Sequence, residues 1–152
     1  VTASNGHFGL QSIDERQDYV PYHMGLKYFQ SEDWLTRNLL ASALGAEGVP
    51  VSMGLKRLPL QHPAFKQQKA FGETGCPFSC PMQEPTWSGN YQEDLPVAVK
   101  LYTDHYLGFP FLGWPNGVEE MKLVLSAVDK VFKYVDQLQD AEISNPNFSS
   151  WR

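Results

Sequence analysis

A change of hydrophobic period in the first third of the chain constrains its fold more than any other feature. Residues 18–29 alternate between two faces, and one of these faces carries Val20, Tyr22, Met24, Leu26 and Tyr28. A period of two residues is typical of a strand with one buried face. Because Pro21 cannot donate to a strand ladder, we expect the strand to begin near it or to lie at a sheet edge.

The segment that follows has the period of a helix instead. Ser31, followed by Glu32 and Asp33, suits a helix start, because a side-chain oxygen and negative charge satisfy the free N–H groups of the first turn. Apolar residues then recur at helical spacing, at Leu35, Leu39, Leu40, Ala43 and Leu44. Gly48 is a natural left-handed residue at a helix end. The segment therefore predicts a helix over residues 32–47.

The rest of the chain predicts two more strands and two more helices. We expect the strands at residues 49–53 and 108–112 and the helices at residues 95–106 and 117–139, with Asn116 as the cap of the last one. This last helix has the clearest apolar stripe of the chain, with residues three and four apart at Met121, Val124, Leu125, Val128, Val131, Phe132, Val135 and Leu138.

This order of elements predicts an α+β fold: a small, mainly antiparallel three-stranded sheet covered on one face by the three helices. Residues 1–16 lack periodicity and are interpreted as an entering arm, and residues 141–152 as a tail. Between them, residues 17–140 form one domain. Within it, residues 54–94 are a long irregular loop rich in Pro, Gly, Gln and aromatic residues. A loop of this length in a compact domain is usually functional or mobile.

Composition excludes several classes of protein. With 152 residues, 42% of them hydrophobic, the chain suits one globular domain. Its net charge of −5 and its scattered basic residues argue against a nucleic-acid surface. No apolar run approaches the roughly 20 residues of a membrane-spanning helix. The first ten residues do not resemble a signal peptide, so we expect a cytoplasmic protein. The start at Val1 rather than Met permits a piece of a longer chain.

Few residues point to catalysis or to metal binding. Nucleophile elbows, P-loops, dinucleotide-binding glycine motifs and zincin motifs are all missing, so we expect no catalytic residue in this chain. Cys76 and Cys80 are the only cysteines, and a zinc site would need two further ligands, for which only His62 and His105 are plausible. We interpret the cysteines as two reduced thiols in a loop and expect no metal. Glu119 and Glu120 are interpreted as ordinary first-turn acids rather than a catalytic pair.

The best candidate for ligand binding lies in the loop after residues 49–53. Lys56 and Arg57 form a basic pair, which could meet a phosphate or a carboxylate. His62 follows between Gln61 and Pro63 and could donate or accept a proton at neutral pH. Residue chemistry leaves two interpretations open: a stiff, solvated connector, or a loop that presents these groups to an anionic ligand.

Four segments in order carry a resemblance to a known family. They read "YVPYHMGLKY", "LTRNLLASALGAEGVPVSMGL", "PLQHPAF" and "DLPVAVKLYTDHYLGFPFLGWPNGVEEMKLVLSAVDKV". Together they resemble the C-terminal small domain of the DegT/StrS family of sugar aminotransferases, which use pyridoxal phosphate. In the family an aromatic residue usually follows the loop glycine and a histidine or tyrosine follows Pro-Leu. This chain has Leu55 at the first place and displaces the histidine to His62.

The resemblance implies that the chain is the substrate-capping small domain of a fold-type I aminotransferase for nucleotide sugars. The parent enzyme is then expected to be a homodimer with an upstream catalytic domain. That domain would supply the lysine for pyridoxal phosphate and the aspartate for its ring nitrogen. This chain alone would be inactive and would bind no cofactor. Lys56, Arg57 and His62 would face an anionic sugar-nucleotide substrate.

Two alternatives stay open beside this reading. The chain could be a free-standing, non-catalytic binding or assembly module with the same fold. The parent could also be a related dehydrase rather than an aminotransferase.

Overall fold

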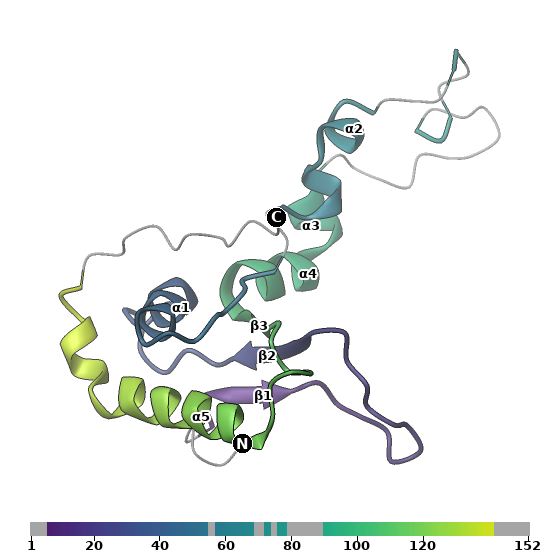
Figure 1. The fold of residues 1–152 in the computed structure, drawn as a ribbon. Helices are drawn as coiled ribbons and strands as arrows, with labels where there is room; N and C mark the ends of the chain where they lie inside the picture. The colour runs from purple at the N-terminus through teal and green to yellow at the C-terminus, as the bar shows by residue number, and fades with distance from the viewer. Residues whose placement is uncertain (1–5, 55–56, 69–71, 74–75, 79–89, 142–152) are drawn as a thin grey trace. The chain divides into compact units, whose positions relative to one another are not determined.

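The computed structural model describes residues 6–54, 57–68, 72–73, 76–78 and 90–141. The chain divides into two compact units. The first, which we call the core unit, combines Val1–Gly54 with Thr103–Arg152, and the second, the insert unit, is Leu55–Tyr102. Figure 1 shows the elements of both units along the chain.

The core unit contains one antiparallel three-stranded sheet. Its strands are β1 (Phe8–Leu10), β2 (Met24–Tyr28) and β3 (Tyr106–Phe109), in the order β1-β2-β3. Phe8 lies opposite Tyr28, and Leu26 lies opposite Leu107. With helices beside it, this sheet gives the small α+β fold predicted from the sequence (Figure 1).

The strands differ from the prediction in their bounds. The alternation continues to the N-terminal side of β2, but Val20 and Tyr22 are 88% and 92% exposed, so the pattern there reflects no buried face. β2 is the central strand and not an edge strand. The edge strand β1 lies within residues 1–16, which were interpreted above as an entering arm. The sequence did not predict this strand because its three residues are too few to show an alternating pattern.

The strand predicted at residues 49–53 is reduced to one bridge. Ser52 and Gly108 exchange two backbone hydrogen bonds of 2.8 and 2.6 Å. In a longer antiparallel ladder, Pro50 and Gly54, two residues before and two residues after Ser52, would also form backbone hydrogen bonds with β3. Pro50 has no N–H to donate, and Gly54 leaves the extended region at a φ of +85°. The pairing with β3 therefore stops after a single residue.

Helix α1 (Arg37–Ala46) begins later than predicted. Its cap is Thr36 and not Ser31, since the Thr36 hydroxyl accepts from the backbone N–H of Leu39 at 3.3 Å. Its end agrees with the prediction. Gly48 has a φ of +84°, and the Val49 N–H donates to the Leu44 carbonyl at 2.9 Å, so the chain turns back toward β3.

Helix α5 (Val118–Lys133) is followed by a 3₁₀ turn, Val135–Leu138. Its cap is Gly117 and not Asn116, whose side chain instead donates to the Phe111 carbonyl at 2.8 Å. Two residues of the predicted stripe, Val128 and Val131, are buried, whereas Leu125 is exposed. The helix is thus amphipathic, with a narrower buried stripe than the sequence suggested.

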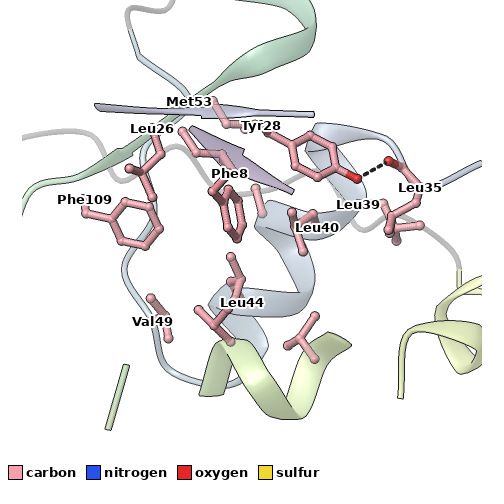
Figure 2. Packing of buried hydrophobic residues seen from close by; sticks show 14 residues of the cluster. Phe8, Leu26, Tyr28, Leu35, Leu39, Leu40, Leu44, Val49, Met53 and Phe109 are labelled. Atoms are coloured by element: carbon pink, nitrogen blue, oxygen red, sulfur yellow. Dashed lines mark hydrogen bonds between the residues drawn. The ribbon is translucent and has the colours of Figure 1, made fainter. Parts of the chain in front are cut away.

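One hydrophobic core joins this sheet to α1 and α5, as Figure 2 shows. The buried members are Phe8, Leu26, Tyr28, Leu35, Leu39, Leu40, Ala41, Leu44, Val49, Met53, Leu107, Phe109, Val128 and Val131. The Tyr28 hydroxyl, which would otherwise be an unsatisfied buried donor, donates to the Leu35 carbonyl at 2.8 Å. At the rim, Lys130 pairs with Glu47 at 2.7 Å and links α5 to the end of α1.

The insert unit is built from short helical pieces. These are a 3₁₀ turn (Pro59–Gln61), α2 (Pro63–Lys66), α3 (Tyr91–Asp94) and α4 (Pro96–Lys100), which continues into a π-helical turn, η2 (Leu101–His105). The segment 54–94 is therefore not wholly irregular. The helix predicted at residues 95–106 changes from α to π geometry at Leu101.

None of the described residues of the insert unit is buried. α4 accordingly contributes no residue to the core cluster, and two of the three predicted helices, α1 and α5, cover the sheet. That the helix at residues 95–106 lies on the same face of the sheet stays a prediction. Among the described helices, none is long and apolar enough to cross a membrane.

Candidate functional site

The basic loop predicted to bind an anion falls in the insert unit. Lys56 lies outside the described residues, so its role stays a prediction. Arg57 and His62 are both exposed. The loop between them is held by local bonds, since the Gln61 side-chain oxygen accepts from the Leu58 N–H at 2.9 Å and the His62 N–H donates to the Pro59 carbonyl at 2.9 Å.

His62 also caps α2. Its Nδ1 accepts from the backbone N–H of Ala64 at 3.3 Å. Because Nδ1 acts as the acceptor, the proton of the neutral ring sits on Nε2. The exposed imidazole therefore offers an N–H donor, and five residues earlier Arg57 offers a guanidinium. This arrangement suits recognition of an oxyanion better than proton abstraction from a substrate.

His105 has a different environment in the core unit. Its ring is partly buried, and Nδ1 lies 2.8 Å from the Tyr28 carbonyl oxygen. A carbonyl can only accept, so Nδ1 carries the proton and Nε2 is the acceptor in the neutral ring. The bond fixes the end of η2 to β2. The structure thus gives His105 a structural role.

The other candidates also serve local roles. The Glu119 carboxylate pairs with Lys122 at 2.7 Å. Glu120 accepts from the Gly117 N–H at 2.7 Å, and this bond lowers the pKa of the Glu120 carboxyl. Glu120 therefore caps the helix and Glu119 forms a surface ion pair, which are ordinary roles for acids of a first turn.

The predicted absence of a metal site concerns Cys76 and Cys80. Cys76 is half-buried, whereas Cys80 lies outside the described residues, so the interpretation of two reduced thiols stays a prediction. Within the part of the chain that the structure describes, no group of three or more His, Cys, Asp or Glu side chains could hold a metal ion.

The second face of the sheet carries a feature that the sequence reasoning missed. Gly25 and Gly108 lie opposite each other on β2 and β3, and the Tyr106 ring lies over both. A Cβ added at Gly25 would come within 2.8 Å of the Tyr106 ring, and one added at Gly108 within 2.8 Å of its hydroxyl. Burial, with a smaller contribution from Tyr19, raises the pKa of Tyr106.

β1 repeats this arrangement at the sheet edge. A Cβ at Gly9 would lie 2.8 Å from the Phe29 ring, and Lys27 places its ammonium 5.1 Å from the centroid of that ring. A glycine inside each strand, at Gly9, Gly25 and Gly108, was the available signal, because glycine in a strand often marks the close approach of another group. The second face is thus covered in part by the chain's own aromatic rings.

Comparison of the chain with protein-family models, with curated proteins and with solved structures finds no match.

Proposed function

We propose that the chain is the C-terminal small domain of a cytoplasmic, pyridoxal-phosphate-dependent sugar aminotransferase of the DegT/StrS kind, in which it caps the substrate. One observation carries the proposal. The segment from Thr36 to Met53, which bears the most specific part of the resemblance, folds as a helix, a left-handed glycine and an extended bridge onto β3. A helix that ends at a glycine and leads into an extended segment beside the sheet is what the resemblance implies for this stretch, and this supports the proposal.

The three lysines of helix α5 do not fit a cofactor site. The ammonium groups of Lys122 and Lys130 pair with Glu119 and Glu47, and that of Lys133 lies 5.3 Å from the centroid of the Tyr134 ring. All three lysines are exposed, and none of them has the desolvated surroundings that activate a lysine as a nucleophile. Pyridoxal phosphate, which supplies the amino-transfer chemistry when bound, would therefore be held by an upstream catalytic domain.

In this proposal the insert unit recognises the substrate. The Arg57 guanidinium and the His62 Nε2–H are donors suited to the phosphate oxygens of a nucleotide sugar, and Lys56 adds a second cation beside Arg57. Their contribution is binding and orientation, not proton transfer.

The most direct test of the proposal is to extend the reading frame upstream of Val1 in the encoding DNA. We expect an in-frame large domain with a lysine and an aspartate placed for the cofactor. A stop codon directly upstream, with no such domain, would overturn the proposal and leave the free-standing binding module.

A second test uses the isolated chain. It is incubated with pyridoxal phosphate and reduced with borohydride, and the adducts are mapped by mass spectrometry. We expect scattered, substoichiometric labelling of surface lysines. A single stoichiometric adduct, with turnover of an amino donor, would place the active site in this chain and contradict the proposal.

The role of the basic loop is tested in the full-length enzyme. Arg57→Gln should raise the KM for the sugar nucleotide by about 10-fold or more, because a charge-assisted hydrogen bond contributes about 1.5–3 kcal/mol. His62→Asn keeps an acceptor for the α2 cap but removes the imidazole, so it separates binding from folding. An unchanged KM in both variants would remove these residues from the substrate site.

A further inference from the structure

Two asparagines of the chain directly precede a glycine, at Asn5-Gly6 and Asn116-Gly117. In such a pair the glycine nitrogen can attack the asparagine side chain, because glycine has no Cβ to hinder the approach. A bond forms between this nitrogen and Cγ, ammonia leaves, and water opens the resulting ring to aspartate or isoaspartate. Asn5 lies outside the described residues. Asn116 and Gly117 are both exposed, so water reaches them.

Both groups that would react at Asn116 are engaged in the folded chain. The Gly117 N–H donates to the Glu120 carboxylate at 2.7 Å, as part of the cap of α5. The Asn116 side-chain amide donates to the Phe111 carbonyl at 2.8 Å. The attack breaks the first bond, because the glycine nitrogen loses its proton when it bonds to Cγ. The departure of ammonia breaks the second.

The charge of Glu120 opposes the reaction as well. The attacking nitrogen is negative once it has lost its proton, and a neighbouring carboxylate repels this charge. The bond from Gly117 holds the pKa of the Glu120 carboxyl below its ordinary value, so this group is ionised at neutral and alkaline pH. Glu119 carries the same charge one residue earlier, but its carboxylate pairs with Lys122 at 2.7 Å.

We propose that Asn116 is a site of spontaneous deamidation, and that Glu120 slows this reaction in the folded chain by holding the Gly117 N–H. The product has a carboxylate, which can only accept, so the bond to the Phe111 carbonyl is lost. Aspartate would place negative charge before the first turn of α5, where this sign is favourable. Isoaspartate would add a methylene to the backbone directly before the helix. The inference goes beyond the proposed function, since it concerns the chain by itself.

Peptide mapping by mass spectrometry, after incubation at mildly alkaline pH, tests the proposal, because deamidation replaces an amide nitrogen by oxygen and changes the peptide mass. The parent chain is compared with Glu120→Ala and with the control Glu119→Ala, which removes the same charge from the same turn. Glu120→Ala should deamidate at Asn116 about 5-fold faster, the factor that corresponds to the net contribution of one hydrogen bond. Glu119→Ala should keep the parental rate. Equal rates in the two variants would overturn the role of Glu120.

A second measurement uses the parent chain alone and does not depend on how the variants fold. Guanidinium chloride unfolds the chain and removes the bonds of the Gly117 N–H and of the Asn116 amide. Asn116 should therefore deamidate faster in the unfolded chain than in the native chain at the same pH. Absence of deamidation at Asn116 in the unfolded chain, or equal rates in the two states, would overturn the proposal.

Discussion

The core unit and the insert unit are stabilised by different kinds of interaction. The core unit joins strands and helices from both ends of the chain through one cluster of buried apolar side chains. The insert unit has aromatic residues too, and Phe65 meets Phe78 edge to face with ring centroids 6.0 Å apart. Yet no described residue of the insert unit reaches full burial.

The difference follows from spacing rather than from the amount of apolar residues. In the core unit, apolar residues repeat with the period of the element they occupy, so each element presents one continuous face. In the insert unit, proline and glycine interrupt the apolar residues between Leu58 and Pro96, and the short helix α4 that follows has no buried side chain. Its helices are capped by neighbours in the sequence, such as His62 on α2. Short-range bonds of this kind fix a local conformation but bury little surface, so substitutions in the two units should differ in their effect on stability.

The largest expected effect is the loss of a core side chain. Leu40 is 0% exposed, so Leu40→Ala should lower the free energy of unfolding by about 2–5 kcal/mol. The matched variant is Val97→Ala in α4, where the side chain is 81% exposed and the expected change is within about 0.5 kcal/mol. Urea denaturation of both variants makes the comparison, and equal losses would mean that the insert unit has a core of its own.

The next effect concerns the glycine face of the sheet. Gly25→Ala should destabilise the core unit by about 1–3 kcal/mol, because the new Cβ would come within 2.8 Å of the Tyr106 ring. Gly45→Ala in α1 is the control: nothing lies within 4 Å of its added Cβ, and the exchange should stabilise by about 0.5–1 kcal/mol. Thermal unfolding would show opposite signs. If Gly25→Ala is neutral, the ring does not lie over this glycine in solution.

A smaller effect is expected from the buried hydroxyl of Tyr28. Tyr28→Phe should lower the free energy of unfolding by about 1 kcal/mol, because the Leu35 carbonyl loses its donor. Burial raises the pKa of Tyr28 to about 12, above its ordinary value of 10.0. The unfolded chain therefore ionises first, and stability should fall as the pH rises from about 10 to 12. Urea midpoints measured across this range should fall less in Tyr28→Phe, and parallel curves would contradict the assignment.

The smallest effect is expected at an exposed, short-range contact of the core unit. Arg16 donates to both carboxylate oxygens of Asp14 at 2.8 Å, and these bonds lower the pKa of Asp14 to about 2. Arg16→Ala should return this pKa toward its ordinary value, measured by NMR titration, with no measurable change in the urea midpoint. A loss of stability comparable to that of Tyr28→Phe would show that such local pairs contribute more than the comparison allows.

The sequence predicted the fold class and most elements of the core unit because periodicity and the glycine at 48 are local signals. It could not predict β1 or the single bridge at Ser52, since these depend on partners that are distant along the chain. Helix α1 is capped by Thr36 and not by Ser31 for the same reason, because tertiary packing decides which of two suitable residues becomes the cap. At the candidate site, Arg57 and His62 were predicted as exposed residues of one loop. The residue types of η2 (Leu101–His105) do not distinguish its π-helical turn from an α-helix, so the sequence could not predict it.

Amide hydrogen exchange followed by mass spectrometry tests the contrast between the two units most directly. Amides of α1, α5 and β2 should exchange only through opening of the whole core unit, whereas those of residues 66–94 should be the least protected of the chain. α4 should fall between them, since it has backbone hydrogen bonds but no buried side chain. We expect this order of protection under native conditions. Exchange in residues 66–94 as slow as in α5 would contradict it.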